Sequence, residues 1–161
     1  MFDYPLSLQL IIFAFLLSEL EAGITSTTTN VTVDDQDPSV LYSGGQWNLS
    51  NPYNSLDCEG FHHFSSQLSA FAVFNFTGIA IYFLSPLWPY SVGAQLVLDG
   101  QSRPVFVDLQ DHSRPVNSSG GPETVSSAVV WGVENLESGN HSLRVEFAQG
   151  RSKYVVLDAF M

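Results

Sequence analysis

Short runs of hydrophobic residues alternate with clusters of turn-forming residues along most of this chain. From Val31 onward, runs rich in Val, Ile, Phe, Tyr and Thr are separated by Gly, Pro, Asn, Asp and Ser. This pattern is typical of β-strands joined by turns, and no window after the N-terminal segment sustains a helical period. The predicted strands are Val31–Asp34, Val40–Tyr42, Gln46–Asn48, Phe61–Ser65, Ser69–Phe76, Ile79–Leu84, Ala94–Leu98, Val105–Leu109, Ser126–Val133, His141–Ala148 and Tyr154–Phe160.

Two pairs of these strands predict direct hairpins. The first joins Ser69–Phe76 to Ile79–Leu84, and the second joins Leu96–Leu98 to Val105–Leu109 around Asp99-Gly100, a strong turn dipeptide. The strands of the first pair are apolar on both alternating faces, which indicates a central strand covered on both sides or a strand that faces a ligand. Many short strands at this spacing predict an all-β fold, an antiparallel β-sandwich or jelly roll.

The N-terminal segment has the pattern of a signal peptide. Leu6–Leu17 is an apolar run that is short of the roughly 20 residues needed to span a bilayer. Ala22 precedes Gly23 at a suitable cleavage site, so we expect residues 1–22 to be a signal peptide. Residues 23–30 then form a flexible Thr-rich leader, and residues 31–161 form the β-sandwich domain. The alternative is that the N-terminus stays uncleaved and anchors the chain in a membrane.

Five Asn-X-Ser/Thr sequences agree with a secretory route. None has proline at the middle position, and each is an acceptor for N-glycosylation in a secreted protein. We therefore expect an extracellular glycoprotein. The acceptor residues are Asn30, Asn48, Asn75, Asn117 and Asn140.

The charge and the cysteine content narrow the set of partners. The chain has 16 acidic and 5 basic residues and a net charge of −11, which disfavours nucleic acid, because binding to phosphates requires Lys and Arg. A neutral or cationic partner, or Ca²⁺, is compatible with this charge. Cys58 is the single cysteine, so it is either a buried free thiol or the site of an intermolecular disulfide.

A set of short motifs follows one another along residues 31–160. They are Val33–Gly44, Trp47, Ala70–Tyr82, Trp88-Pro89-Tyr90, Leu98-Asp99-Gly100, Gly139–Val145 and Leu157–Phe160. In this order they resemble the extracellular domain of a large fungal (basidiomycete-type) group of secreted and single-span membrane proteins. The resemblance implies a galactose-binding-like jelly roll, the fold of many carbohydrate-binding modules.

This chain departs from that group at its C-terminus. Members often continue into a Ser/Thr-rich stalk, a transmembrane helix and a cytoplasmic tail, whereas this sequence ends at Met161. The sequence has no second apolar run of the length that a transmembrane helix needs. We therefore expect either a freely secreted form or a truncated form of a membrane-anchored protein.

The Trp88-Pro89-Tyr90 motif is the sharpest candidate for a binding site. Pro86 and Pro89 bracket Trp88, which predicts a loop rather than a paired strand. Sugar rings stack on aromatic faces of this kind, so we expect Trp88 and Tyr90 to contact a ligand. The alternative is that Trp88 closes the open end of the sandwich.

Trp47, His62 and His63 are secondary candidates for ligand contacts. Adjacent residues on a strand point to opposite faces, so His62 and His63 are not expected to bind one metal ion together. No zinc-ligand spacing of Cys or His is present. One histidine is therefore expected to face a groove while the other packs or faces solvent.

Asp34, Asp35 and Asp158 are candidates for a structural Ca²⁺ site. Ca²⁺ is bound by six to eight oxygen ligands. The resemblance to jelly-roll binding modules implies such an ion between the first and last strands. The alternative is that the aspartates bond to nearby backbone N–H groups in a turn.

Motifs for catalysis are absent from the sequence. It has no nucleophile elbow and no glycine-rich phosphate loop. We therefore expect no enzyme and no cofactor other than the structural Ca²⁺. The predicted function is non-catalytic recognition of a cell-wall or matrix glycan through the aromatic loop. The alternative is a glycosylated structural or protein-interaction ectodomain with no sugar affinity.

Overall fold

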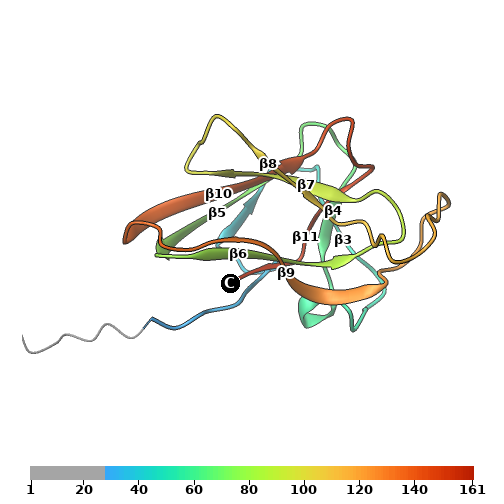
Figure 1. Cartoon of the computed structure of the whole chain (residues 1–161), viewed down its shortest axis with the longest axis horizontal. Helices are drawn as coiled ribbons and strands as arrows, with labels where there is room; N and C mark the ends of the chain where they lie inside the picture. Colours follow the sequence, from blue (N-terminus) through green and yellow to red (C-terminus); the bar gives the residue numbers. More distant parts are fainter. Residues whose placement is uncertain (1–27) are drawn as a thin grey trace, which may run out of the picture. The chain divides into compact units, whose positions relative to one another are not determined.

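Two β-sheets face each other and form a sandwich (Figure 1). The computed structural model describes residues 28–161, of which Val31–Met161 forms one unit that is described by itself. A 3-10 helix spans Cys58–Gly60, and all other regular elements are strands. They are β1 (Val33–Asp34), β2 (Val40–Tyr42), β3 (Asn48–Leu49), β4 (His63–Ser65), β5 (Phe71–Gly78), β6 (Ile81–Leu87), β7 (Gly93–Leu98), β8 (Val105–Asp108), β9 (Val125–Val133), β10 (Gly139–Phe147), β11 (Val155–Leu157) and β12 (Ala159–Phe160).

The strand order is that of an antiparallel sandwich. One sheet has the order β1-β12-β6-β9 and the opposite sheet has the order β2-β5-β10-β7-β8. A small third sheet, β11-β4-β3, lies at one end of the sandwich, next to the end of β7 (Figure 1). Every pair of named strands is antiparallel, so the predicted fold class is confirmed.

The hydrophobic core lies between the two large sheets. Alternate residues of β5, β10 and β7 point inward from one sheet, and Ile81, Phe83 and Phe160 face them from the other. Phe74 of β5 stacks on Phe160 of β12, with ring centroids 4.8 Å apart. The residues before and after each inward residue point to the outer face of the sheet, because side chains alternate along a strand.

One of the two predicted hairpins is confirmed and the other is wrong. β7 and β8 pair directly, and Asp99 and Gly100 both have positive φ, of 49° and 65°, in the turn that follows β7. In contrast, β5 and β6 lie in opposite sheets. Strand β5 lies between β2 and β10, and strand β6 lies between β12 and β9. Both edges of each strand are therefore occupied, and β5 and β6 do not pair with one another.

The side chain of Arg144 covers part of the outer face of β5. Ala72 and Phe74 are buried in the core, whereas Asn75 on the outer face is exposed. The guanidinium of Arg144 lies over the outer ring of Phe71, 3.6 Å from its centroid. A cation over an aromatic face is a favourable contact, so the outer apolar residues of this strand need no second layer of protein.

The proline before the aromatic motif lies inside a strand rather than in a loop. β6 extends to Leu87 and includes Pro86, and its pairing with β9 shifts register between Ser85 and Leu87. A bulge of this kind accommodates a residue that lacks an N–H donor. Residues 28–161 contain no helix long and apolar enough to cross a bilayer.

Candidate functional site

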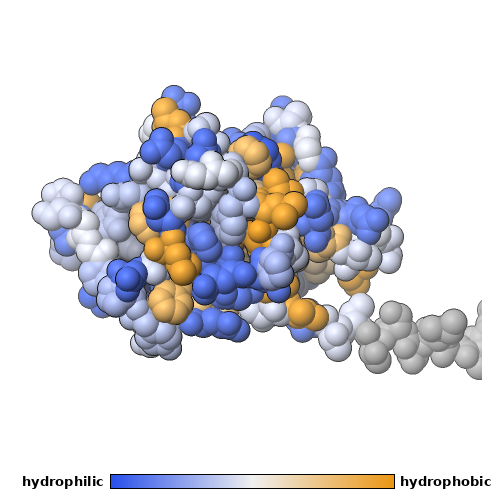
Figure 2. Space-filling model, turned by 180° about the vertical axis from the view of Figure 1, so that it is seen from behind, coloured by the Kyte–Doolittle hydropathy of each residue, from blue (hydrophilic) through white to orange (hydrophobic). Residues whose placement is uncertain are grey.

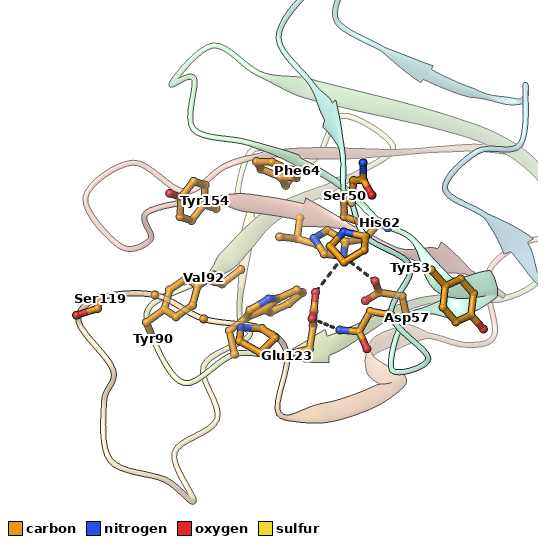
Figure 3. Close-up of a pocket in the computed structure, with 18 residues that line it drawn as sticks. Ser50, Tyr53, Asp57, His62, Phe64, Tyr90, Val92, Ser119, Glu123 and Tyr154 are labelled. Carbon is orange, nitrogen blue, oxygen red and sulfur yellow. Dashed lines mark hydrogen bonds and ion pairs between the residues drawn. The ribbon is translucent and has the colours of Figure 1, made fainter.

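A half-open pocket of about 700 Å³ lies at the end of the sandwich that carries the small third sheet. Its walls come from four segments that are distant in sequence: residues 50–64, residues 88–92, residues 119–123 and β11 with the residue before it. Figure 3 shows side chains from these segments around one hollow. Loops positioned on a rigid sheet are the usual location of binding residues.

His62 lies at the polar floor of this pocket, between two carboxylates (Figure 3). Its Nδ1 is 3.0 Å from Oδ2 of Asp57 and 3.2 Å from Oε1 of Glu123. The three side chains are almost fully buried, with exposed fractions of 9%, 0% and 7% for His62, Asp57 and Glu123. Burial opposes protonation of His62, but the hydrogen bond and charge of Asp57 and the charge of Glu123 outweigh it and raise the pKa of the imidazole.

The loop that precedes β4 holds this floor in place. The amide of Asn54 donates to Oε2 of Glu123, and its Oδ1 accepts the N–H of Leu56. The backbone N–H of His62 donates to Oγ of Ser50 at 2.9 Å. Asn54 therefore joins the 50–64 segment to the 119–123 segment through one side chain.

Aromatic residues form the walls of the pocket. Trp88 is only 3% exposed and meets His62 edge-on, with centroids 5.4 Å apart. Tyr90 and Tyr154 are half-buried and lie edge to face at 6.3 Å, and Tyr154 also contacts Phe64 at 6.1 Å. Burial raises the pKa of Tyr90 to about 12, so its hydroxyl stays protonated and can donate a hydrogen bond.

Three of the predicted ligand-contact residues line this pocket, and two do not. Trp88, Tyr90 and His62 line it. Trp47 lies elsewhere, where its Nε1 donates to the carbonyl of Phe71 at 3.1 Å. His63 points to the opposite side of β4 from His62, and its Nδ1 lies 2.5 Å from Oδ2 of buried Asp35.

The three aspartates considered for Ca²⁺ have separate partners. Asp34 accepts the N–H of Gln36, Asp35 bonds to His63, and Asp158 accepts the N–H of Cys58 and the hydroxyl of Ser127. Within residues 28–161, they do not form a group of three ligand atoms within 4.8 Å of one another, whereas Asp57, His62 and Glu123 do. Oδ1 of Asp34 and Oδ1 of Asp35 are buried and have no hydrogen-bond partner. The Ca²⁺ site at Asp34, Asp35 and Asp158 therefore stays a prediction.

Cys58 lies beside the buried carboxylate of Asp158, which accepts its N–H. Burial is the main cause that raises the pKa of its thiol to about 11, and the neighbouring carboxylates add to it. The thiol is therefore protonated at neutral pH and is a weak nucleophile. The pKa of Asp158 is raised to about 7, again mainly by burial.

Asp57, Asn54, Glu123 and Tyr154 are site residues that the sequence analysis missed. Asp57 lies five residues before His62, and this proximity is the one signal that could have indicated it. Glu123 lies in a loop of Ser, Gly and Pro, 61 residues beyond His62, and only the folded chain brings the two together.

Comparisons with known proteins support the fold. No family model matches the chain, and no curated protein matches its sequence. Among solved structures, a family 35 carbohydrate binding module from Clostridium thermocellum matches with a TM-score of 0.55 and 12% identity, over 83% of this chain and 98% of the module.

Two fungal enzymes also contain a similar region. An exo-beta-1,3-galactanase from Phanerochaete chrysosporium matches with a TM-score of 0.52 and 17% identity, over 84% of this chain and 29% of the enzyme. A GH26-CBM35 beta-(1,4)-mannanase from Podospora anserina matches with a TM-score of 0.52 and 15% identity, over 81% of this chain and 26% of the enzyme. This chain thus spans less than a third of either enzyme, and at these identities the likeness establishes the β-sandwich fold.

Proposed function

We propose that this protein is a non-catalytic carbohydrate-binding domain whose binding site is the end pocket. The observation that carries the proposal is the pocket itself, in which half-buried aromatic rings surround a floor of hydrogen-bonding side chains. Its similarity in fold to a family 35 carbohydrate binding module supports the same conclusion.

The chemistry of the pocket suits a neutral sugar. Tyr90 and Tyr154 offer ring faces for the C–H face of a pyranose. The carboxylate of Glu123, whose side chain is 7% exposed on the pocket floor, can accept a hydrogen bond from a hydroxyl group. A chain with net charge −11 and two carboxylates on the pocket floor would repel an acidic sugar. We therefore propose a neutral, hydroxyl-rich glycan as the ligand.

The positions of the two carboxylates favour binding over hydrolysis. Glycosidases place two carboxyl groups about 5–10 Å apart on either side of the scissile bond. Here Asp57 and Glu123 both approach the same nitrogen of His62, within 3.0 and 3.2 Å, and their facing oxygens lie within 4.8 Å of one another on the pocket floor. This arrangement can orient hydroxyl groups but lacks an acid and a base that flank a glycosidic bond.

A glycan array with matched tyrosine variants tests the proposal. We expect Tyr90→Ala and Tyr154→Ala to weaken binding of the preferred glycan about tenfold or more, which corresponds to roughly 1.4 kcal/mol. Tyr82, whose hydroxyl donates to Glu134 outside the pocket, provides the control Tyr82→Ala. Equal losses in all three variants, or a silent array with folded protein, would contradict the proposal. Trp88→Ala is a poorer test, because Trp88 belongs to the core.

We also propose that the protein is secreted and N-glycosylated. All five acceptor asparagines are exposed, including Asn75, which lies within β5 between two residues that face the core side. Digestion of the secreted protein with a peptide N-glycosidase should convert each occupied asparagine to aspartate. Peptide mass spectrometry that finds no converted site would overturn this part.

A role in protein interaction is the second candidate. β9 is the last strand in the order of its sheet, and it carries the exposed side chains of Val125 and Val129, 39% and 49% exposed. Strands at the edge of a sheet can pair with another chain. Figure 2, however, shows hydrophobic residues of the displayed face in separate small patches within a largely polar surface. Light scattering with size-exclusion chromatography tests this candidate, since a stable dimer would favour it.

A further inference from the structure

Asp57, His62 and Glu123 place one nitrogen and two oxygen ligands around a common point. These atoms all lie within 4.8 Å of one another, and the side chains come from two loops that converge at the pocket floor (Figure 3). No other group of three such side chains occurs in the part of the chain that the structure describes.

Two separations between the ligand atoms are slightly shorter than those of a tetrahedral metal site. Zinc binds histidine nitrogen and carboxylate oxygen at about 2.0–2.2 Å, so adjacent ligand atoms of a tetrahedron lie about 3.3–3.6 Å apart. Nδ1 of His62 is 3.0 Å from Asp57 and 3.2 Å from Glu123. A small outward movement of the two carboxylates would open the site to that size.

Hydrogen bonding among the protein groups alone leaves this floor incompletely satisfied. Nδ1 of His62 carries at most one hydrogen, and two carboxylates compete for it. The side chain of Asp57 is fully buried, and its other oxygen, Oδ1, has no hydrogen-bond partner. A buried carboxylate oxygen without a partner is costly, and a bound cation would remove that cost.

The types of donor indicate the class of cation. Ca²⁺ and Mg²⁺ prefer sites made of oxygen alone, whereas an imidazole nitrogen with carboxylate oxygens suits Zn²⁺ and similar transition metals. Zinc sites with three protein ligands keep a fourth position for water or substrate. Because all three residues line the pocket, that fourth position would open into it.

We propose that Asp57, His62 and Glu123 bind one divalent transition-metal ion of the zinc class at the floor of the pocket. The metal site rests on this geometry alone. A second step rests on the proposed glycan-binding function: a sugar hydroxyl displaces water from the fourth position, so the ion contributes to recognition of the glycan.

Zinc titration of the whole purified chain by calorimetry, after treatment with EDTA and buffer exchange, tests the metal site. At pH 7.5 we expect one Zn²⁺ per chain, and we expect His62→Gln and Glu123→Gln to weaken the affinity at least tenfold. The matched control is His112→Gln, because His112 also pairs with an aspartate, Asp108, but on the exposed surface. A millimolar excess of Ca²⁺ should not displace the zinc. Absence of saturable binding, or equal affinity in all variants, would overturn the proposal.

Co²⁺ provides a test that needs no variant. In a tetrahedral site it absorbs visible light far more strongly than in its hexaaqua form. We expect visible bands at one equivalent that disappear when Zn²⁺ is added. A folded protein whose Co²⁺ spectrum is that of the free ion would overturn a tetrahedral site, even if His62→Gln fails to fold.

Glycan binding with and without metal separates the two proposals. Zinc binding with a silent glycan array supports the metal site and contradicts the glycan proposal. Glycan binding that is equal in EDTA and in Zn²⁺ contradicts the second step and leaves the glycan proposal intact. Glycan binding that falls at least tenfold in EDTA and returns with Zn²⁺, but not with Ca²⁺, supports both.

Discussion

The rings of Phe74 and Phe160 stack between the two large sheets, with centroids 4.8 Å apart and planes 6° from parallel. Phe74 is in the five-stranded sheet and Phe160 is in the last strand of the chain, so this contact joins the two layers of the sandwich. Phe160 is 1% exposed, and Phe83 packs against it from within the same sheet.

Replacement of Phe160 by alanine should destabilise the domain strongly. The substitution removes a buried ring and leaves a cavity, which typically costs about 3–5 kcal/mol. Urea unfolding monitored by circular dichroism measures the change. The control is Leu41→Ala on the edge strand β2, where the side chain is 56% exposed and a change within about 0.5 kcal/mol is expected. A cost below 1 kcal/mol for Phe160→Ala would contradict the role of this stack.

Local sequence patterns predicted most strands because strand alternation and turn residues are local signals. The β7–β8 hairpin is an example, since Asp99 and Gly100 adopt the positive φ values that such a turn requires. The position of β6 was predicted, but its partners were not. Pairing depends on which strands lie on either side, and a two-residue connection between β5 and β6 is compatible with a hairpin or with a crossing between sheets.

The candidate site was predictable only where its residues carry an unusual local signal. Trp88 and Tyr90 were found because aromatics beside proline are conspicuous, and His62 because a His-His pair is rare. Asp57 and Glu123 belong to ordinary polar loops, and their approach to His62 depends on the whole fold. The burial of Trp88, at 3% exposure, also depends on that fold, and it leaves Tyr90 and Tyr154 as the accessible rings.

Asn54 is expected to act as a positioning residue for Glu123. Its amide donates to Glu123 while its oxygen accepts the N–H of Leu56, so Asn54→Asp keeps the second bond and places a carboxylate against Glu123. We expect this variant to lose roughly 1–3 kcal/mol of stability, as a buried acceptor loses its donor and gains a like charge. Chemical unfolding measures this loss.

Asn54→Ala separates repulsion from the loss of the donor. It should also lower stability, but without the like charge its loss should be less dependent on salt than that of Asn54→Asp. If Glu123 must be held by Asn54 to serve as a ligand, both variants should weaken zinc binding. Unchanged zinc affinity in both would contradict a positioning role and leave a structural role only.

The pair of His141 and Asp99 should make stability depend on pH. Nδ1 of His141 lies 2.8 Å from Oδ2 of Asp99, and this hydrogen bond is the main cause that raises the pKa of His141 above 6.5. Asp99 has a pKa below 3.8, mainly because it accepts the N–H of Ser142. The contribution of His141 is therefore complete below pH 6.5 and is lost as the pH rises through its folded pKa. The contribution of Asp99 is present above pH 3.8 and is lost as the pH falls through its folded pKa.

A double-mutant cycle of His141→Gln and Asp99→Asn measures this coupling. The coupling energy should be larger at pH 5.5 than at pH 8.5, because the ion pair exists only while His141 is protonated. The matched comparison is a cycle on His112 and Asp108, whose side chains are 67% and 47% exposed and whose coupling should be smaller. Equal coupling at the two pH values would show that the charge of His141 does not contribute.

A glycan on Asn117 should restrict access to the pocket. The backbone N–H of Asn117 donates to the carbonyl of Pro89 at 2.7 Å, and its Oδ1 accepts the N–H of Ser119, which lines the pocket. A glycan on Asn117 would therefore begin at the pocket rim, between the aromatic motif and the loop that carries Glu123.

Ser119→Ala abolishes this acceptor sequence but retains Asn117 and its backbone contacts. In secreted protein we expect Ser119→Ala to increase the association rate of long oligosaccharides more than that of monosaccharides, because a longer ligand extends past the rim. Asn140→Gln on β10 removes a predicted acceptor outside the pocket and should leave both rates unchanged. Surface plasmon resonance measures both rates, and equal rates for Ser119→Ala and the wild type, with Asn117 shown by mass spectrometry to be glycosylated, would mean that this glycan points away from the pocket.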